Sequence, residues 1–182
     1  YSTTGAALFV VAPAGADGNF VNNVVAKAGG GCRDATIGTS FSAPVVSGVI
    51  ALMLQVNPEL GWRDVQGILA ETSTKIDTDT DEDSWIVNGA GLHHSYQYGF
   101  GIVNAAAAVQ ASQSWQKYGP EQQIILDSGF LNWTIADDAD VPTISTQQVA
   151  EDAYNGTFAA ESVVVYLDLV HASRGDLLLV LT

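Results

Sequence analysis

Apolar positions along the first half of the chain predict one short strand and one long helix. Residues 6–11 form a continuous apolar run, which is typical of a buried strand in a parallel sheet. Residues 14–31 are rich in glycine, asparagine and alanine, which predicts a loop. Residues 45–56 place apolar side chains on nearly every helical face, so we expect a helix buried on all sides, with Pro44 in its first turn.

Two shorter helices are predicted further along the chain. Residues 62–71 repeat apolar positions with helical spacing. The apolar face so formed consists of Trp62, Val65, Ile68 and Leu69. Residues 105–112 follow Asn104, a residue type that caps helix N-termini well. The acidic stretch 76–82 predicts a turn and residues 88–98 predict a loop.

The pattern changes after Trp115. Residues 163–170 show period-two patterning, which favours a β-sandwich or barrel. The two alternating sets are Val163, Val165, Leu167 and Leu169, and Val164, Tyr166, Asp168 and Val170. Four segments are expected to form strands, namely 124–126, 133–135, 162–170 and 177–181. We therefore expect a boundary near residues 115–120, between the end of an α/β domain (1–115) and the start of a β-rich domain (116–182).

Composition and charge narrow the classes of function. Apolar residues make up 47% of the chain, which excludes wholesale disorder. Six basic and twenty acidic residues give a net charge of −14, which argues against nucleic acid as a partner and suits cationic peptides or calcium. The run 45–56 is shorter than the roughly 20 residues that cross a bilayer, so no transmembrane segment is predicted.

The segment 38–48 carries the main candidate for catalysis. Ser40 lies where a glycine-containing loop meets the predicted apolar helix, and the first N–H groups of a helix have no intrahelical partner. The helix dipole adds positive charge there, so the N–H of Ser40 can stabilise an oxyanion on a carbon that its hydroxyl attacks. The alternative is that Ser40 is an ordinary N-cap. The Gly-x-Ser-x-Gly elbow of α/β hydrolases is absent, because residue 42 is serine.

The sequence Gly38-Thr39-Ser40-Phe41-Ser42-Ala43-Pro44, followed by a helix rich in small residues, resembles the nucleophile segment of subtilisin-like serine proteases. Further stretches resemble the kexin/furin-like proprotein convertase branch: Cys32, 62–66, 94–99 and 174–177. The resemblance implies an α/β fold, in which the C-terminal part of a parallel-sheet peptidase domain is followed by an incomplete β-sandwich, the P or Homo B domain.

The same resemblance implies a serine endopeptidase that hydrolyses (pro)proteins through an acyl-enzyme on Ser40, with Gly38 and Thr39 binding substrate and cleavage after basic residues. The family order places the catalytic Asp and His, and the oxyanion Asn, before the serine. Both ends of the chain are expected to be cut, so those groups would lie upstream of Tyr1 and the chain alone would be inactive. The expected location is the secretory pathway (Golgi or endosomal membrane) or the extracellular space. The alternative is an inactive relative that binds proteins.

Family order also argues against the three histidines as the general base, namely His93, His94 and His171. Cys32 is the single cysteine, and the resemblance implies a disulfide to a cysteine upstream. The triplets that start at Asn132 and Asn155 are N-glycosylation sequons.

Calcium is implied by the resemblance, with sites mostly outside the chain. Convertases often carry a calcium-binding Glu where this chain has Thr3. Asp77, Asp79 and Asp81 are weak calcium candidates, because alternating carboxylates can converge on one ion, but a solvated acidic loop is the other interpretation. The tripeptide 174–176 fits a turn between strands or, as the alternative, an integrin-type motif.

Overall fold

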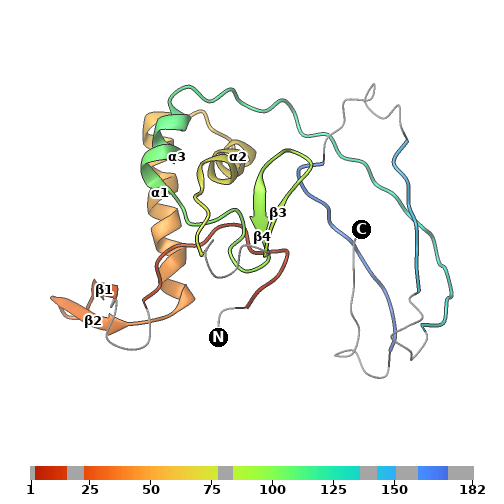
Figure 1. Cartoon of the computed structure of the whole chain (residues 1–182), viewed down its shortest axis with the longest axis horizontal. Coiled ribbons are helices and arrows are strands. Elements are labelled where there is room, and N and C mark those ends of the chain that lie inside the picture. The colour runs from red at the N-terminus through yellow and green to blue at the C-terminus, as the bar shows by residue number, and fades with distance from the viewer. Residues whose placement is uncertain (1–2, 16–22, 78–83, 136–142, 151–159, 172–182) are drawn as a thin grey trace. The chain divides into compact units, whose positions relative to one another are not determined.

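The computed structural model describes residues 3–15, 23–77, 84–135, 143–150 and 160–171. Contacts divide the chain into two units, Tyr1–Gly119 and Pro120–Thr182, which we call unit 1 and unit 2. Unit 1 holds all the described helices and strands (Figure 1). Each unit is described by itself.

Unit 1 begins with an irregular segment and a hairpin. The predicted strand at residues 6–11 is wrong, because the segment makes a single parallel bridge, Val11 to Ile102. The antiparallel hairpin consists of β1 (Asn23–Ala26) and β2 (Cys32–Thr36). The predicted loop over 14–31 is therefore wrong at β1. The turn between the strands is made by three successive glycines with positive φ, 29–31, a conformation that glycine adopts without steric cost.

The three predicted helices form at the expected places. They are α1 (Ser42–Val56), α2 (Trp62–Thr72) and α3 (Ala105–Ser112). The Asn104 side chain caps α3 as predicted, since its Oδ1 accepts a hydrogen bond from the N–H of Ala107 at 3.0 Å. The buried core is shared among the helices and the turn before α2; it contains Val49, Met53, Leu60, Val65, Ile68, Leu69 and Ala108. Trp62, expected on this face, is exposed instead.

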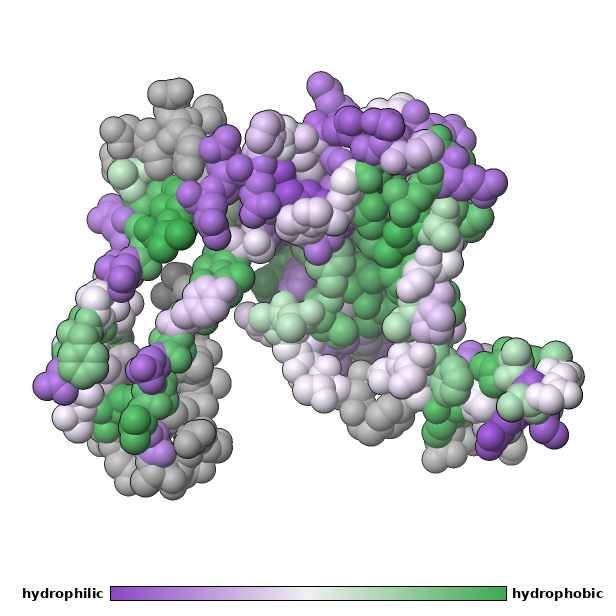
Figure 2. Space-filling model, turned by 180° about the vertical axis from the view of Figure 1, so that it is seen from behind, coloured by the Kyte–Doolittle hydropathy of each residue, from purple (hydrophilic) through white to green (hydrophobic). Residues whose placement is uncertain are grey.

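The prediction that α1 is buried on all sides is wrong for this chain. Only Val49 and Met53 are buried in α1, whereas Val45, Leu52 and Val56 are 42%, 49% and 42% exposed. Helical spacing puts these three and Gly48 on one side, which we call the open face of α1. Among the described elements, α3 and the short 3-10 helix η1 (Thr39–Phe41) make the main contacts with α1, and neither covers this face. Hydrophobic residues gather on the α1 side of unit 1 (Figure 2).

The stretch Thr39–Val56, which includes α1, is long and apolar enough to cross a membrane on length and composition alone. The core helix of a soluble domain meets the same criterion. The prediction of no transmembrane segment was based on the shorter apolar run 45–56. In the structure the helical stretch begins earlier, at Thr39.

A second antiparallel hairpin, β3 (Trp85–Val87) with β4 (His93–Ser95), follows α2. The loop predicted over 88–98 is therefore wrong at β4. The sheets among the described residues are these two hairpins. The resemblance implies a parallel sheet, and among the described residues the parallel pairing is the single bridge between Val11 and Ile102. At this bridge the N–H of Val103 donates to the Val11 carbonyl at 2.9 Å.

Unit 2 contains no helix or strand among its described residues. The strands predicted at 124–126, 133–135 and 162–170 are therefore wrong for this structure, and the segment 177–181 lies outside the described residues. An alternating segment forms a strand only when a neighbour pairs with its backbone, and none of the described segments of unit 2 does so. Apolar side chains stay in solvent as a result, with Tyr166 92% and Val170 96% exposed.

Candidate active site

Ser40 is exposed and its hydroxyl does not cap a helix. The residue lies in the short 3-10 helix η1 (Thr39–Phe41), which runs directly into α1. Gly38 is the N-cap of η1 and Phe41 is the N-cap of α1, and no side-chain hydrogen bond caps either helix. The interpretation of Ser40 as an ordinary N-cap is therefore wrong, and the residue is exposed.

The turn that presents Ser40 depends on Gly38. Its φ of 145° lies in a region that residues with a Cβ rarely adopt. The N–H of Gly38 donates to the Ala14 carbonyl at 3.0 Å, and its own carbonyl accepts from the N–H of Phe41 at 2.9 Å. Two backbone hydrogen bonds thus fix both sides of the turn immediately before Ser40.

The backbone around Ser40 can stabilise negative charge. The N–H groups of Thr39 and Ser40 come before the N–H of Phe41, the first that donates within η1, so helix geometry gives them no intrahelical partner. The fifteen residues of α1 follow without an acidic side chain in the first turn, which leaves the positive end of the helix dipole uncompensated. An exposed hydroxyl beside unpaired N–H groups is the arrangement that acyl transfer requires of a nucleophile and half of an oxyanion hole.

A hollow of about 650 Å³ lies on the β1–β2 hairpin and reaches Phe41, the residue after Ser40. Its lining includes two cations, Lys27 and Arg33, and one carboxylate, Asp34. The predicted substrate-binding residues, Gly38 and Thr39, do not line it. This hairpin was not predicted from the sequence, although the glycines at 29–31, which follow Val24 and Val25, are a signal for a turn between strands.

The described contacts of unit 1 do not give Ser40 a general base. His93 and His94 both lie on β4 and pack against aromatic rings. The His93 ring is 5.3 Å from Trp85, and the His94 ring is 5.1 Å from Phe100, centroid to centroid. None of the described contacts of either imidazole includes Ser40. The third histidine, His171, belongs to unit 2.

Comparison with known sequences decides the family. The sequence profile of the subtilase family matches residues 1–101, which includes Ser40 and the turn before it. This chain belongs to the subtilase family. Relatives of this subtilase include a PC3-like endoprotease (variant B) of Hydra vulgaris, 38% identical over 151 residues. Another is proprotein convertase subtilisin/kexin type 5 of Homo sapiens, 34% identical over 161 residues.

The subtilase chain spans only part of each relative. The two alignments cover 80% and 83% of this chain, but 20% and 8% of the relatives. They place the chain on the kexin/furin-like side of the family. A solved serine protease of Aeromonas sobria aligns with 49% of this chain and 18% of its own length, at 27% identity and a TM-score of 0.45.

The described residues of the subtilase contain no cluster of acidic side chains for the calcium that the resemblance implies. Asp77, the one weak candidate ligand that is described, has its Oδ2 occupied by the hydroxyl of Tyr98, which donates at 2.6 Å. Asp79 and Asp81 lie outside the described residues. Three or more His, Cys, Asp or Glu side chains do not converge anywhere in the described part, whereas calcium takes six to eight oxygen ligands.

The predicted covalent sites of the subtilase lie on exposed backbone where they are described. Cys32 is a free, exposed thiol at the start of β2. Asn132 is exposed in unit 2, as a glycan acceptor must be. Asn155 and the tripeptide 174–176 lie outside the described residues.

Proposed function

We propose that this chain carries the nucleophile of a serine endopeptidase of the kexin/furin type. The observation that carries the proposal is that Ser40 is exposed, does not cap a helix and lies inside the subtilase match. Its Oγ attacks the carbonyl carbon of a substrate peptide bond, and the N–H of Ser40 donates to the oxyanion. The hydroxyl proton passes to an imidazole and then to the leaving amine, and water hydrolyses the resulting ester.

We propose that the imidazole and its orienting carboxylate come from parts of the protein beyond these 182 residues. The relatives that this chain matches are about five to twelve times as long as the matched part, and the described contacts of His93 and His94 are with aromatic rings. The open face of α1 supports the same proposal, because an uncharged apolar helix face gains stability when other residues cover it.

The substrates that we propose are proteins or pro-proteins cleaved after basic residues in the secretory pathway. The names of the relatives and the net charge of −14 support this proposal. The hollow beside Phe41 is lined by two cationic side chains and one carboxylate, a balance that does not favour a basic substrate side chain there. The proposed disulfide of Cys32 and the proposed glycan on Asn132 fit the same route.

We further propose that residues 116–182 are the start of a P domain. The alignments with the two relatives span 151 and 161 residues, whereas the subtilase profile ends at residue 101. Similarity to proprotein convertases therefore continues well past the peptidase profile and into unit 2.

A fluorophosphonate probe tests the proposed activity in the full-length protein. We expect covalent labelling at Ser40, lost in Ser40→Ala and kept in Ser47→Ala. Ser47 is a matched control, because its hydroxyl donates to the Ala43 carbonyl within α1 and has no proposed role in catalysis. An unlabelled full-length protein, under conditions that label a reference subtilase, would support the inactive protein-binding relative instead.

A further inference from the structure

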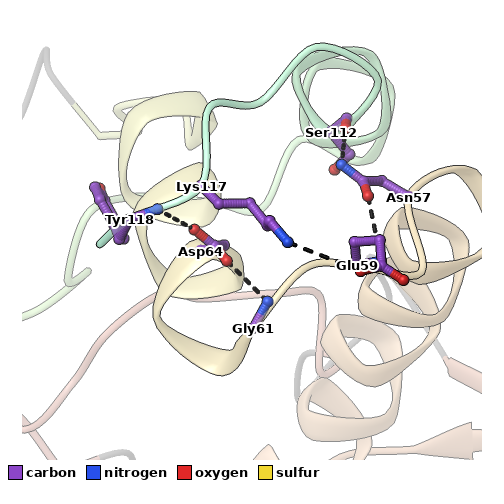
Figure 3. A network of polar contacts seen from close by, with 7 residues as sticks. All are labelled: Asn57, Glu59, Gly61, Asp64, Ser112, Lys117 and Tyr118. Atoms are coloured by element: carbon purple, nitrogen blue, oxygen red, sulfur yellow. Dashed lines mark hydrogen bonds and ion pairs between the residues drawn. The ribbon is translucent and has the colours of Figure 1, made fainter. Parts of the chain in front are cut away.

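Asp64, in the first turn of α2, holds together three parts of unit 1. The side chain is buried, with 5% of the residue exposed. Its Oδ2 accepts a hydrogen bond from the N–H of Gly61 at 2.8 Å. Its Oδ1 accepts from the N–H of Tyr118 at 2.8 Å (Figure 3) and also from the indole N–H of Trp115 at 3.1 Å. One carboxylate thus caps α2 and also binds a segment more than fifty residues later.

That segment, residues 115–119, is irregular and we call it the strap. It leaves α3 and runs along α2 up to the last residue of unit 1. The Tyr118 ring lies against Gly67, where a Cβ would come within 2.8 Å of a ring carbon. The Arg63 guanidinium lies 5.4 Å from the centre of the Tyr118 ring and donates to the Gly119 carbonyl at 2.7 Å.

The contacts of the strap differ in strength. Hydrogen bonds to a charged acceptor are about twice as strong as neutral ones, and a buried carboxylate left without donors is costly. Asp64 supplies two such bonds to the strap from inside the protein. The ion pair of Lys117 with Glu59, at 3.8 Å, lies in solvent, where such pairs contribute little. The Arg63 bond to the Gly119 carbonyl is also charge-assisted, but it is exposed, so Asp64 is the main buried polar anchor.

We propose that the strap is latched onto α2 by Asp64 and opens as one local unit, so that this latch fixes where the chain leaves unit 1. The latch has a helix residue on one side and an irregular segment on the other, so its opening needs no helix to unfold. This inference concerns the end of unit 1 and does not depend on the proposed catalysis.

Hydrogen exchange in the full-length protein, measured on peptides that cover the strap, tests the latch. In Asp64→Asn we expect exchange at the Tyr118 amide to accelerate about 10- to 100-fold, the change that loss of a charged hydrogen bond produces. Glu71→Gln is the matched control, because it neutralises an exposed carboxylate on the same helix. It should leave exchange in the strap unchanged.

A second variant keeps the test decisive if Asp64→Asn does not fold. Trp115→Phe retains the ring and removes only the indole N–H donor, so we expect about three- to tenfold faster exchange at the strap. Combining the two substitutions should add less than the sum of their effects, because both act on one group. Unchanged exchange in Trp115→Phe, or equal acceleration throughout α1 and α3, would overturn the proposal.

Discussion

α1 and α2 belong to one unit, yet only α2 is completed by the chain itself. The buried face of α2 meets the core and its first turn is closed by the strap. α1 carries no charged residue and leaves Val45, Leu52 and Val56 in solvent. The apolar composition of a helix indicates how much of its surface favours burial. The structure shows how much of that surface these 182 residues bury. Ser40 lies at the end of the incompletely covered helix.

The largest expected effect is at Ser40. In the full-length protein, Ser40→Ala should lower kcat for a peptide substrate by about a millionfold, the loss known for subtilisin, a member of the same family. The measurement is steady-state turnover, with Ser47→Ala as the control at wild-type rate. Turnover by Ser40→Ala within about tenfold of wild type would show that another group is the nucleophile.

The open face of α1 gives the next largest effect. If residues beyond this chain cover it, Leu52→Ala should destabilise the full-length protein by about 2–5 kcal/mol, as loss of a buried leucine does. Met53→Ala, whose side chain is already buried here, should cost a similar amount and serves as the reference. Chemical unfolding measures both. A cost of under about 0.5 kcal/mol for Leu52→Ala, the value for a surface position, would mean that the face stays open.

α3 contacts both α1 and α2. Loss of its N-terminal cap should have a smaller effect on the free energy of unfolding. Asn104→Ala removes the hydrogen bond to the N–H of Ala107 and should lower the free energy of unfolding by about 1 kcal/mol. Gln110→Ala, at an exposed position of the same helix, should change it by less than about 0.5 kcal/mol. Equal effects of the two variants in urea unfolding would show that the cap contributes nothing.

The smallest expected effect is a loss of stability at acid pH, and it concerns Asp64 in α2. Burial tends to raise the pKa of Asp64, but its three N–H donors and the nearby Lys117 ammonium lower that pKa on balance. Its contribution to stability is therefore present above the unfolded value of about 3.9, and is lost as the pH falls through the lower folded value.

Unfolding measured between about pH 7 and about pH 3 should show a loss of stability in wild type that is reduced in Asp64→Asn. Glu71→Gln, on the same helix, should lose as much stability at acid pH through Asp64 as wild type does. An identical acid dependence in wild type and Asp64→Asn would contradict the lowered pKa.

Local signals made part of this fold predictable. α2 and α3 follow from helical spacing and from Asn104, both of which act within one or two turns. The nucleophile segment could be identified because Gly38, Ser40 and Pro44 lie close together in the sequence. Where glycines mark a turn, as at 29–31, the signal was present but was interpreted as loop.

Contacts between distant residues could not be predicted from the sequence. Asp64 and the strap are more than fifty residues apart, so no local pattern joins them. The alternation at residues 163–169 signals a strand, but a strand needs a pairing partner that the described part of unit 2 does not provide. The prediction that α1 is buried on all sides is wrong for the same reason. A sequence pattern shows that a helix face is apolar, but it does not show which residues cover that face.

The most direct measurement compares the rate at which a fluorophosphonate modifies Ser40 in the full-length protein and in the 182-residue chain. Our account predicts rapid, stoichiometric modification of Ser40 in the full-length protein and no specific modification in the shorter chain, because the imidazole that activates the hydroxyl lies elsewhere. Equal rates in the two proteins, or no modification of the full-length protein, would contradict it.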